Sequence, residues 1–404
     1  VHENAFSISE PGKFKMASNA SDEQLKIASK ALNYPWYDGL CRENEQSSFM
    51  KMPFAPNPES DFEFNKETGE ITKYIGNDSD VIIPREISGV PVRSIAYGAF
   101  TNAEDYTKTE VTSNKTEWLK IKNIVVPETV TSLPDSCFNY IQSLENFICY
   151  GPLETTGKST FNVCRKLKNV VFVNGARLID NYAFSDCRNL ERVVCRGTAD
   201  MLGQYAFIES GIKELKLNVG EISLNAFSKA EHLEKIHIGA GIEKFDLSAI
   251  ALCPKLSELS LGFKNPASFI SENFFLAEPL SGLTVKLPND TSDEEKQAML
   301  EFLKRNRLIN DENALKTEAL DDKINIPSSD EISKLIGKAL IDVGNPESVP
   351  NKQEAEQAKP AEDKPADDKP AEQHNSEQGA ASKFVLDKKY VCTKCEMNGT
   401  TIDA

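Results

Sequence analysis

Apolar residues recur along the middle of the chain in the phrase apolar-x-x-apolar-x-apolar. Successive copies begin 21 to 24 residues apart, and a second phrase, usually Ala-Phe, runs in step with them, as at Ala183-Phe184. A unit this short cannot bury its own apolar face, so the copies are predicted to stack into a solenoid with a parallel sheet along one side. The copies begin at Ile121, Leu144, Leu167, Leu190, Ile212, Leu233, Leu256 and Leu280.

Side chains alternate along a strand, so the phrase also predicts which residues leave the core. If Ile124 and Val126 face inward, then Asn123 and Val125 face outward. Over the first coils this register places a column of asparagines beside an apolar strip. Two explanations stay open: the ladders stabilise the sheet without a ligand, or the strip is covered by a partner, by the N-terminal unit or by the insertion near Trp118. The candidate partner-binding residues are Asn123, Val125, Asn146, Ile148, Asn169, Val171 and Val194.

The clearest copy, "LIDNYAFSDCRNLERVVC" at residues 178–195, resembles the unit of the BspA-like leucine-rich repeat family. Residues 62–100 are similar to the first coils of that family, and the likeness extends over about residues 61–290. It departs in the long insertion after Phe100 and in Ser248-Ala-Ile250, which replaces the aromatic phrase. The resemblance implies an α/β repeat solenoid with coils of about 23 residues in a right-handed, horseshoe-like arc. It also implies a surface-displayed adhesion or interaction protein of bacteria or protists.

The segments outside the repeats have patterns of their own. Capping boxes at Ser21, Ser292 and Ser328 each predict the start of a helix, and the helix after Ser292 is a natural cover for the last coil. The stretch "NKQEAEQAKPAEDKPADDKPAEQ" has almost no large apolar residue and is predicted to stay disordered as a spacer. The predicted organisation is a partly helical N-terminal unit at 1–60, the solenoid at 61–290, capping helices at 291–343, a linker at 344–382, and a short Cys-x-x-Cys tail at 383–404 that fits part of a truncated domain.

Charge and motif content argue against several classes of function. The 62 acidic residues exceed the 46 basic ones, which gives a net charge of −16 and argues against a nucleic-acid partner. No apolar run approaches the roughly 20 residues that a membrane span needs. Gly157-Lys158-Ser159-Thr160 lacks the first glycine of a phosphate loop, because Pro152 stands at that position. His237 falls on an outward strand position and is predicted to be a solvated surface residue. We therefore expect neither catalysis nor a cofactor.

Eight of the nine cysteines fall into two groups. Cys392 and Cys395 have the spacing of one half of a zinc site and are the candidate metal ligands, but a closed site needs four ligands and no second pair follows. An unmetallated tail is the simpler interpretation. Six other cysteines occupy repeat positions and are predicted to be buried thiols of raised pKa. Cys164 and Cys187 share one repeat position, so their side chains should point in parallel rather than form a disulfide.

These observations predict a non-catalytic protein, at the cell surface or secreted, that binds a protein or glycan partner through the solenoid sheet. A monomer is favoured over an oligomer. One alternative is an intracellular leucine-rich-repeat scaffold for protein–protein interaction, which reduced cysteines and the Cys-x-x-Cys tail would favour. The other is the binding module of a larger enzyme.

Overall fold

The computed structural model describes residues 50–100, 120–270, 280, 282–321 and 323–341, together with the short parallel strands β1 (Lys15–Met16) and β2 (Cys41–Arg42). Four predicted features lie outside these residues: the helix after Ser21, the insertion at about 101–116, the linker at 344–382 and the tail at 383–404.

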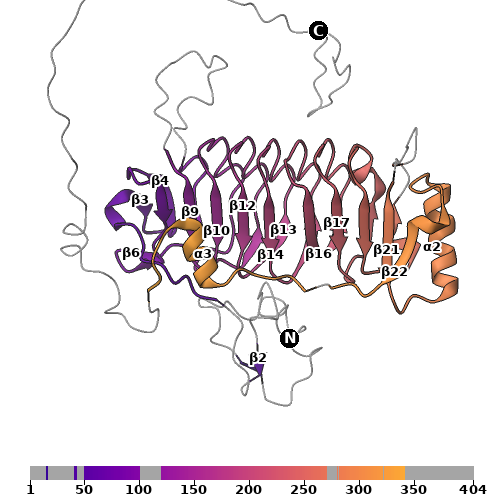
Figure 1. The fold of residues 1–404 in the computed structure, drawn as a ribbon. Helices are drawn as coiled ribbons and strands as arrows, with labels where there is room; N and C mark the ends of the chain where they lie inside the picture. Colours follow the sequence, from indigo (N-terminus) through magenta and orange to yellow (C-terminus); the bar gives the residue numbers. More distant parts are fainter. Residues whose placement is uncertain are drawn as a thin grey trace, which may run out of the picture. The chain divides into compact units, whose positions relative to one another are not determined.

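The repeated phrase of each coil forms one strand of a parallel sheet, here called the front sheet (Figure 1). Equivalent residues of successive coils are partners in this sheet: Asn123 pairs with Asn146, and Asn146 with Asn169. The predicted register is therefore confirmed. One hydrogen-bonded ladder ends at β14, and the next begins with the first half of β16, which contacts β14. The front strands are β5 (Asp80–Ile82), β9 (Asn123–Val126), β10 (Asn146–Cys149), β12 (Asn169–Phe172), β14 (Arg192–Cys195), β16 (Glu214–Ile222), β17 (Lys235–Ile238), β19 (Glu258–Leu261), β21 (Thr284–Pro288) and β22 (Leu315–Glu318).

A second parallel sheet, the back sheet, lies on another side of the coils. Its strands are β11 (Leu153–Thr155), β13 (Ala176–Ile179), β15 (Thr198–Leu202), the second half of β16, β18 (Lys244–Asp246) and β20 (Phe269–Ile270). The solenoid is thus built mostly of strands and turns, and the expected horseshoe arc is not confirmed. An arc needs one side of each coil to be wider than the other, whereas strands on both sides repeat at the same spacing of about 4.8 Å.

Short strands and turns complete the first coils and the corners. The first coils contain β3 (Phe62–Asn65), β4 (Glu70–Tyr74) and β8 (Ser94–Ile95) in one small sheet, and β6 (Glu86–Ile87) with β7 (Val90–Pro91) in a hairpin. Four 3₁₀ turns occur among the described residues, at Glu59–Asp61, Leu247–Ile250, Pro266–Ser268 and Glu312–Ala314.

The Ala-Phe phrase builds a continuous aromatic row inside the coils. Phe184 stacks on Phe161, with ring centroids 5.3 Å apart, and on Phe207 at 5.0 Å. Each ring lies one coil from the next, so the row joins neighbouring units that could not fold alone. The other members of the row, all buried, are Phe100, Phe138 and Phe227.

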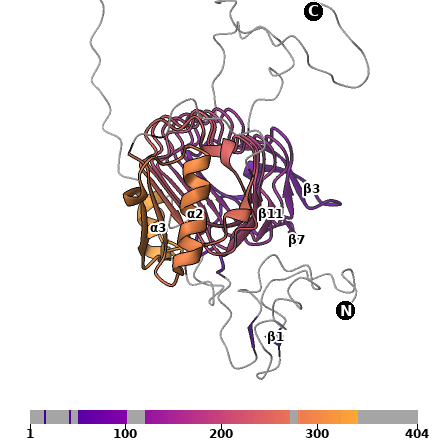
Figure 2. The ribbon, with the colours of Figure 1, turned by 90° about the vertical axis from the view of Figure 1, so that its right-hand side faces the viewer.

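The two predicted C-terminal helices both begin at their capping boxes. Helix α2 (Asp293–Arg305) follows Ser292 and lies across the end of the coils (Figure 2), where Phe302 stacks on Phe269 with centroids 5.0 Å apart. It covers the last coil, as predicted. Helix α3 (Ser329–Ile336) follows Ser328 but lies on the front sheet near β9 and β10 instead of at the solenoid end (Figure 1). Within the described residues, neither helix has the length and apolar character of a membrane span.

Candidate functional site

The apolar strip predicted to face outward lies on the front sheet but is not exposed. Val125, Ile148, Val171 and Val194 leave the solenoid core as predicted, yet at most 6% of each is exposed. They belong to a second apolar cluster, which also contains Tyr150 and Val173 of the coils and four residues from the two flanks: Met52, Phe54, Ile332 and Ile336. These side chains therefore face away from the solenoid core but not toward solvent, because the chain covers them itself. The cover comes from the N-terminal segment 50–54, one of the predicted alternatives, and from α3, which was not among them.

The asparagine column forms a hydrogen-bonded ladder, as the ligand-free explanation predicts. The Asn169 amide donates to Asn146 Oδ1 over 2.8 Å, and the Asn146 amide donates to Asn123 Oδ1 over 2.7 Å. Asn123 in turn donates to Asp80 Oδ1 over 2.6 Å, and Lys338 lies 3.4 Å from the other oxygen of that carboxylate. These amides satisfy one another's hydrogen bonds across three coils, so the ladder is stable without a bound partner.

A buried carboxylate holds the N-terminal segment on the front sheet. Glu128 is 6% exposed and accepts from Arg85 Nε over 2.7 Å and from the Met52 backbone N–H over 3.2 Å. The Arg85 guanidinium also donates to the Met52 carbonyl. Two coils further on, Asn174 accepts a hydrogen bond from the Met50 N–H over 2.9 Å and donates one to the Met50 carbonyl over 2.7 Å. The Glu128–Arg85 ion pair and the hydrogen bonds of the Asn174 side chain therefore hold this segment against the sheet.

The N-terminal segment and the chain beyond α3 meet on the same face, in a contact here called the clasp. Phe54 and Leu340 form an antiparallel bridge, and the Ile341 N–H donates to the Pro53 carbonyl over 2.8 Å. Lys338, two positions before Leu340, adds the ion pair with Asp80 at the start of β5. Segments nearly 290 positions apart in the chain thus close over the apolar half of the front sheet.

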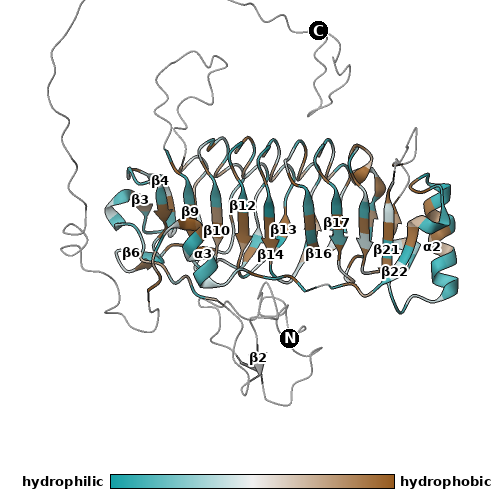
Figure 3. Ribbon diagram, in the orientation of Figure 1, coloured by the Kyte–Doolittle hydropathy of each residue, from teal (hydrophilic) through white to brown (hydrophobic). Residues whose placement is uncertain are grey.

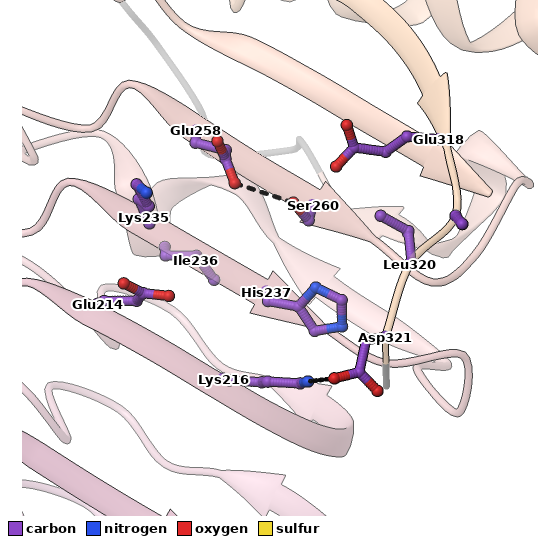
Figure 4. A pocket seen from close by; sticks show the side chains of 11 residues that line it. Glu214, Lys216, Lys235, Ile236, His237, Glu258, Ser260, Glu318, Leu320 and Asp321 are labelled. Atoms are coloured by element: carbon purple, nitrogen blue, oxygen red, sulfur yellow. Dashed lines mark hydrogen bonds and ion pairs between the residues drawn. The ribbon is translucent and has the colours of Figure 1, made fainter. Parts of the chain in front are cut away.

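The other half of the front sheet is polar and borders a groove. Its outward side chains come from β16, β17 and β19, and the residues that follow β22 form the opposite wall (Figure 4). Figure 3 shows the same division as a change from brown toward teal between β12 and β17. The groove holds about 210 Å³ and is lined by Glu214, Lys216, Lys235, Ile236, His237, Glu258, Ser260, Glu318, Ala319, Leu320 and Asp321. We call it the polar groove.

Ion pairs between the sheet and the opposite wall organise the polar groove. Lys216 Nζ lies 3.2 Å from Asp321, and Lys286 Nζ lies 2.9 Å from Glu318 and 3.0 Å from Glu258. The hydrogen bond to Glu318 raises the pKa of Lys286 most, and the hydrogen bond to Glu258 raises it further. The hydrogen bond from the Lys323 backbone N–H lowers the pKa of Asp321 most, and the hydrogen bond from the Lys216 ammonium lowers it further. Lysines of the front sheet therefore pair with carboxylates across the groove.

His237 and the candidate metal ligands have different outcomes. His237 occupies the predicted outward position, but it is half-buried in the polar groove beside Asp321 instead of fully solvated. In the part of the chain that the structure describes, no group of three or more His, Cys, Asp or Glu residues is arranged to hold a metal ion. Cys392 and Cys395 lie outside that part.

Thr160 is fully buried in the Ala-Phe position, which agrees with a structural role for the Gly157–Thr160 stretch.

The six repeat cysteines are buried free thiols, as predicted. Burial raises the pKa of Cys164 to about 12 and that of Cys187 well above its ordinary value. Their sulfur atoms lie 3.1 Å from the carbonyl oxygens of Phe138 and Phe161, each in the preceding coil. Side chains at equivalent positions thus point in parallel, and the thiols serve packing rather than chemistry.

Comparison with known proteins agrees with the repeat analysis. Residues 109–230 and 214–298 match the BspA type leucine rich repeat region in six copies. No curated protein matches the chain. Among solved structures, the chain is similar to a leucine-rich cell surface protein of Faecalibacterium prausnitzii, at 15% identity and a TM-score of 0.35 over 67% of this chain and 96% of that one. It is also similar to a leucine-rich repeat protein of T. pallidum, at 18% identity and a TM-score of 0.29 over 61% and 95% of the two chains.

Those structural likenesses are too distant to carry an argument, so the assignment depends on the repeats. Eight copies of one phrase, an in-step aromatic row and six matched family units coincide over the same residues. A stacked array of this kind presents ordered side chains on its sheet and serves as a repeat protein-interaction module. Residues 109–298 of this chain, which form the greater part of the two-sheet solenoid, are therefore a BspA type leucine rich repeat region.

Proposed function

We propose that this chain is a non-catalytic binding module, at the cell surface or secreted, that recognises a protein or glycan partner through the polar half of its front sheet. One observation carries the choice of surface. The apolar half is occupied by segment 50–54, α3 and the clasp. The polar half keeps exposed residues such as Glu214 and Lys235 at the first positions of adjacent strands.

The polar groove suits a partner with hydrogen-bonding groups and charges of both signs. Strand spacing of about 4.8 Å places outward side chains at regular intervals, which holds them in position before a partner arrives. Glu214 and Lys235 are register partners, and Lys216 pairs likewise with His237. Electrostatic complementarity of this kind contributes specificity and association rate. Sugar hydroxyls and charged peptide side chains both fit this description.

A scaffold inside the cell would use the same surface, and one observation favours it as the second candidate. Six cysteines are unpaired in the described part of the chain, as in proteins of reducing compartments. Their burial in repeat positions also explains them as packing residues in any compartment. The choice of partner surface is the same for both candidates.

Binding of the full chain to an array of glycans and to candidate surface proteins tests the proposal. Lys235→Glu reverses an exposed charge at the start of β17, and the matched control Lys244→Glu does so at the start of β18 in the back sheet. For a ligand of the wild-type chain, we expect Lys235→Glu to weaken binding at least about tenfold, which is about 1.4 kcal/mol. Lys244→Glu should leave binding unchanged. Equal effects of the two substitutions would place the site elsewhere.

A further inference from the structure

The connection between β22 and α3 has almost no slack. Seven steps between neighbouring front strands separate β22 from β10, which at about 4.8 Å each is about 34 Å. Ser329, the first residue of α3, lies beside the hydroxyl of Tyr150, which directly follows β10. From Glu318 to Ser329 the chain has eleven residue steps, and a fully extended chain spans at most about 36 to 40 Å over that number. The spare length is therefore less than two residues.

Residues 319–341, here called the strap, dock mainly through α3 and the residues after it. Before α3, Ile324 and Ile326 pack half-buried against the second apolar cluster, and Asp321 pairs with Lys216. Ile332 and Ile336, one helical turn apart, are its fully buried helix residues and fit into the second apolar cluster. Lys338 adds the ion pair with Asp80, and Ile341 adds the clasp hydrogen bond. Most other described side chains of the strap are exposed or half-buried. The strap is thus a small amphipathic ligand held in an apolar seat, a common mode of helix recognition between separate chains.

We propose that the strap can be exchanged between two copies of this chain, so that each strap docks on the front sheet of the other copy. The second copy is the occupant whose chemistry is already matched, because its strap has the same isoleucines and the same lysine for the same seat. Exchange restores the contacts of α3 and of the clasp on the other copy, and it releases the part of the strap before α3, which is nearly fully extended within one copy. Short connecting segments without slack favour this kind of swap. The inference does not depend on a ligand in the polar groove.

A pair of complementary full-length variants tests the exchange. The first carries Ile332→Glu and Ile336→Glu, so that its strap cannot dock while its front sheet stays intact. The second carries Ile148→Lys and Val171→Lys, so that its front sheet rejects a strap while its own strap stays intact. Each variant alone should have the monomer mass of 44.8 kDa by size-exclusion chromatography with light scattering. Mixed at equal concentration, they should form a one-to-one complex of twice that mass.

Two results would overturn the proposal. In the first, the mixture stays at the monomer mass while both variants keep the circular dichroism spectrum and cooperative melting of the wild type. In the second, either variant dimerises alone, which would mean that the copies associate through another surface. If the double lysine variant fails to fold, Val194→Lys at the margin of the cluster, where 6% of the side chain is already exposed, provides a milder block. A chain with all four substitutions is the control that should not join either variant.

Discussion

Docking of α3 on the front sheet should behave as a local equilibrium with a limited free energy. Ile332 is fully buried and Ile336 is 3% exposed, and both contact the second apolar cluster. Truncation of a buried isoleucine to alanine costs about 2–5 kcal/mol when the site cannot relax. Here the site can relax, because an eight-residue helix with two buried anchors can leave the sheet while the solenoid stays folded. We therefore expect the loss to stop at the free energy of docking.

The expected signature is strong non-additivity. Ile332→Ala alone should remove most of the docking free energy, and addition of Ile336→Ala should cost less than about 1 kcal/mol more, because the helix has already left its seat. Leu335→Ala is the matched control on the same helix: this side chain is 37% exposed, so its truncation should cost less than about 0.5 kcal/mol.

Hydrogen exchange measures the effect where it occurs. In Ile332→Ala the amides of α3 should lose protection, and those of the aromatic row should keep it, because the coils do not depend on the strap for their packing. Urea unfolding of the solenoid should show a nearly unchanged transition. The reasoning fails if the two isoleucine substitutions add fully and lower the main unfolding transition together, since the strap would then be part of the cooperative core.

The core of the coils gives three further predictions. Leu190→Ala should cost about 2–5 kcal/mol in urea unfolding, whereas Glu191→Ala, one position along and exposed, should cost less than about 0.5 kcal/mol; similar losses would contradict the register. Gly211→Ala should lower the melting temperature, because a Cβ there would lie 2.0 Å from a backbone oxygen of the preceding coil, whereas Gly241→Ala meets only a methyl group at 3.6 Å and should be tolerated. The buried cysteines should resist alkylation until the chain unfolds. Because burial raises the pKa of Cys149 and of Cys195 to about 12, the folded chain keeps protons that the unfolded chain releases, and stability should fall as pH rises from about 9 toward 12.

The periodic features of this fold were predictable because each depends on contacts one coil away. The strand register, the buried cysteines and the asparagine ladder follow from a repeat of about 23 residues and the alternation of side chains. The capping boxes at Ser292 and Ser328 predicted both C-terminal helices for a similarly local reason. The horseshoe arc, which is not confirmed, is a different case, because curvature depends on the relative width of the two sides of a coil, and the repeated phrases predicted strands on one side only.

The cover of the front sheet could not be placed in advance, because its contacts join distant segments. Met50 bonds to Asn174 across 124 positions, and α3 returns along the whole row of strands to reach β9 and β10. The sequence did contain two partial signals. An outward apolar strip that would be costly to leave bare predicted some cover, and the amphipathic segment after Ser328 had no partner in the solenoid core. The sequence could not match these two signals, because it does not show that the segment after Ser328 returns to the apolar strip in space.

The outward column still marks where the cover ends. Its apolar members stop at Val194, and the equivalent position in the next coil is Lys216. The structure places the ladder break between β14 and β16 at this same step, and Lys216 is where the strap changes from apolar packing to the ion pair with Asp321. A lysine in the seat of α3 would leave a buried charge without a partner, so the strap can pack closely only over the four apolar coils. Beyond them the outward side chains remain available, and for this reason we expect partner recognition to begin at β16.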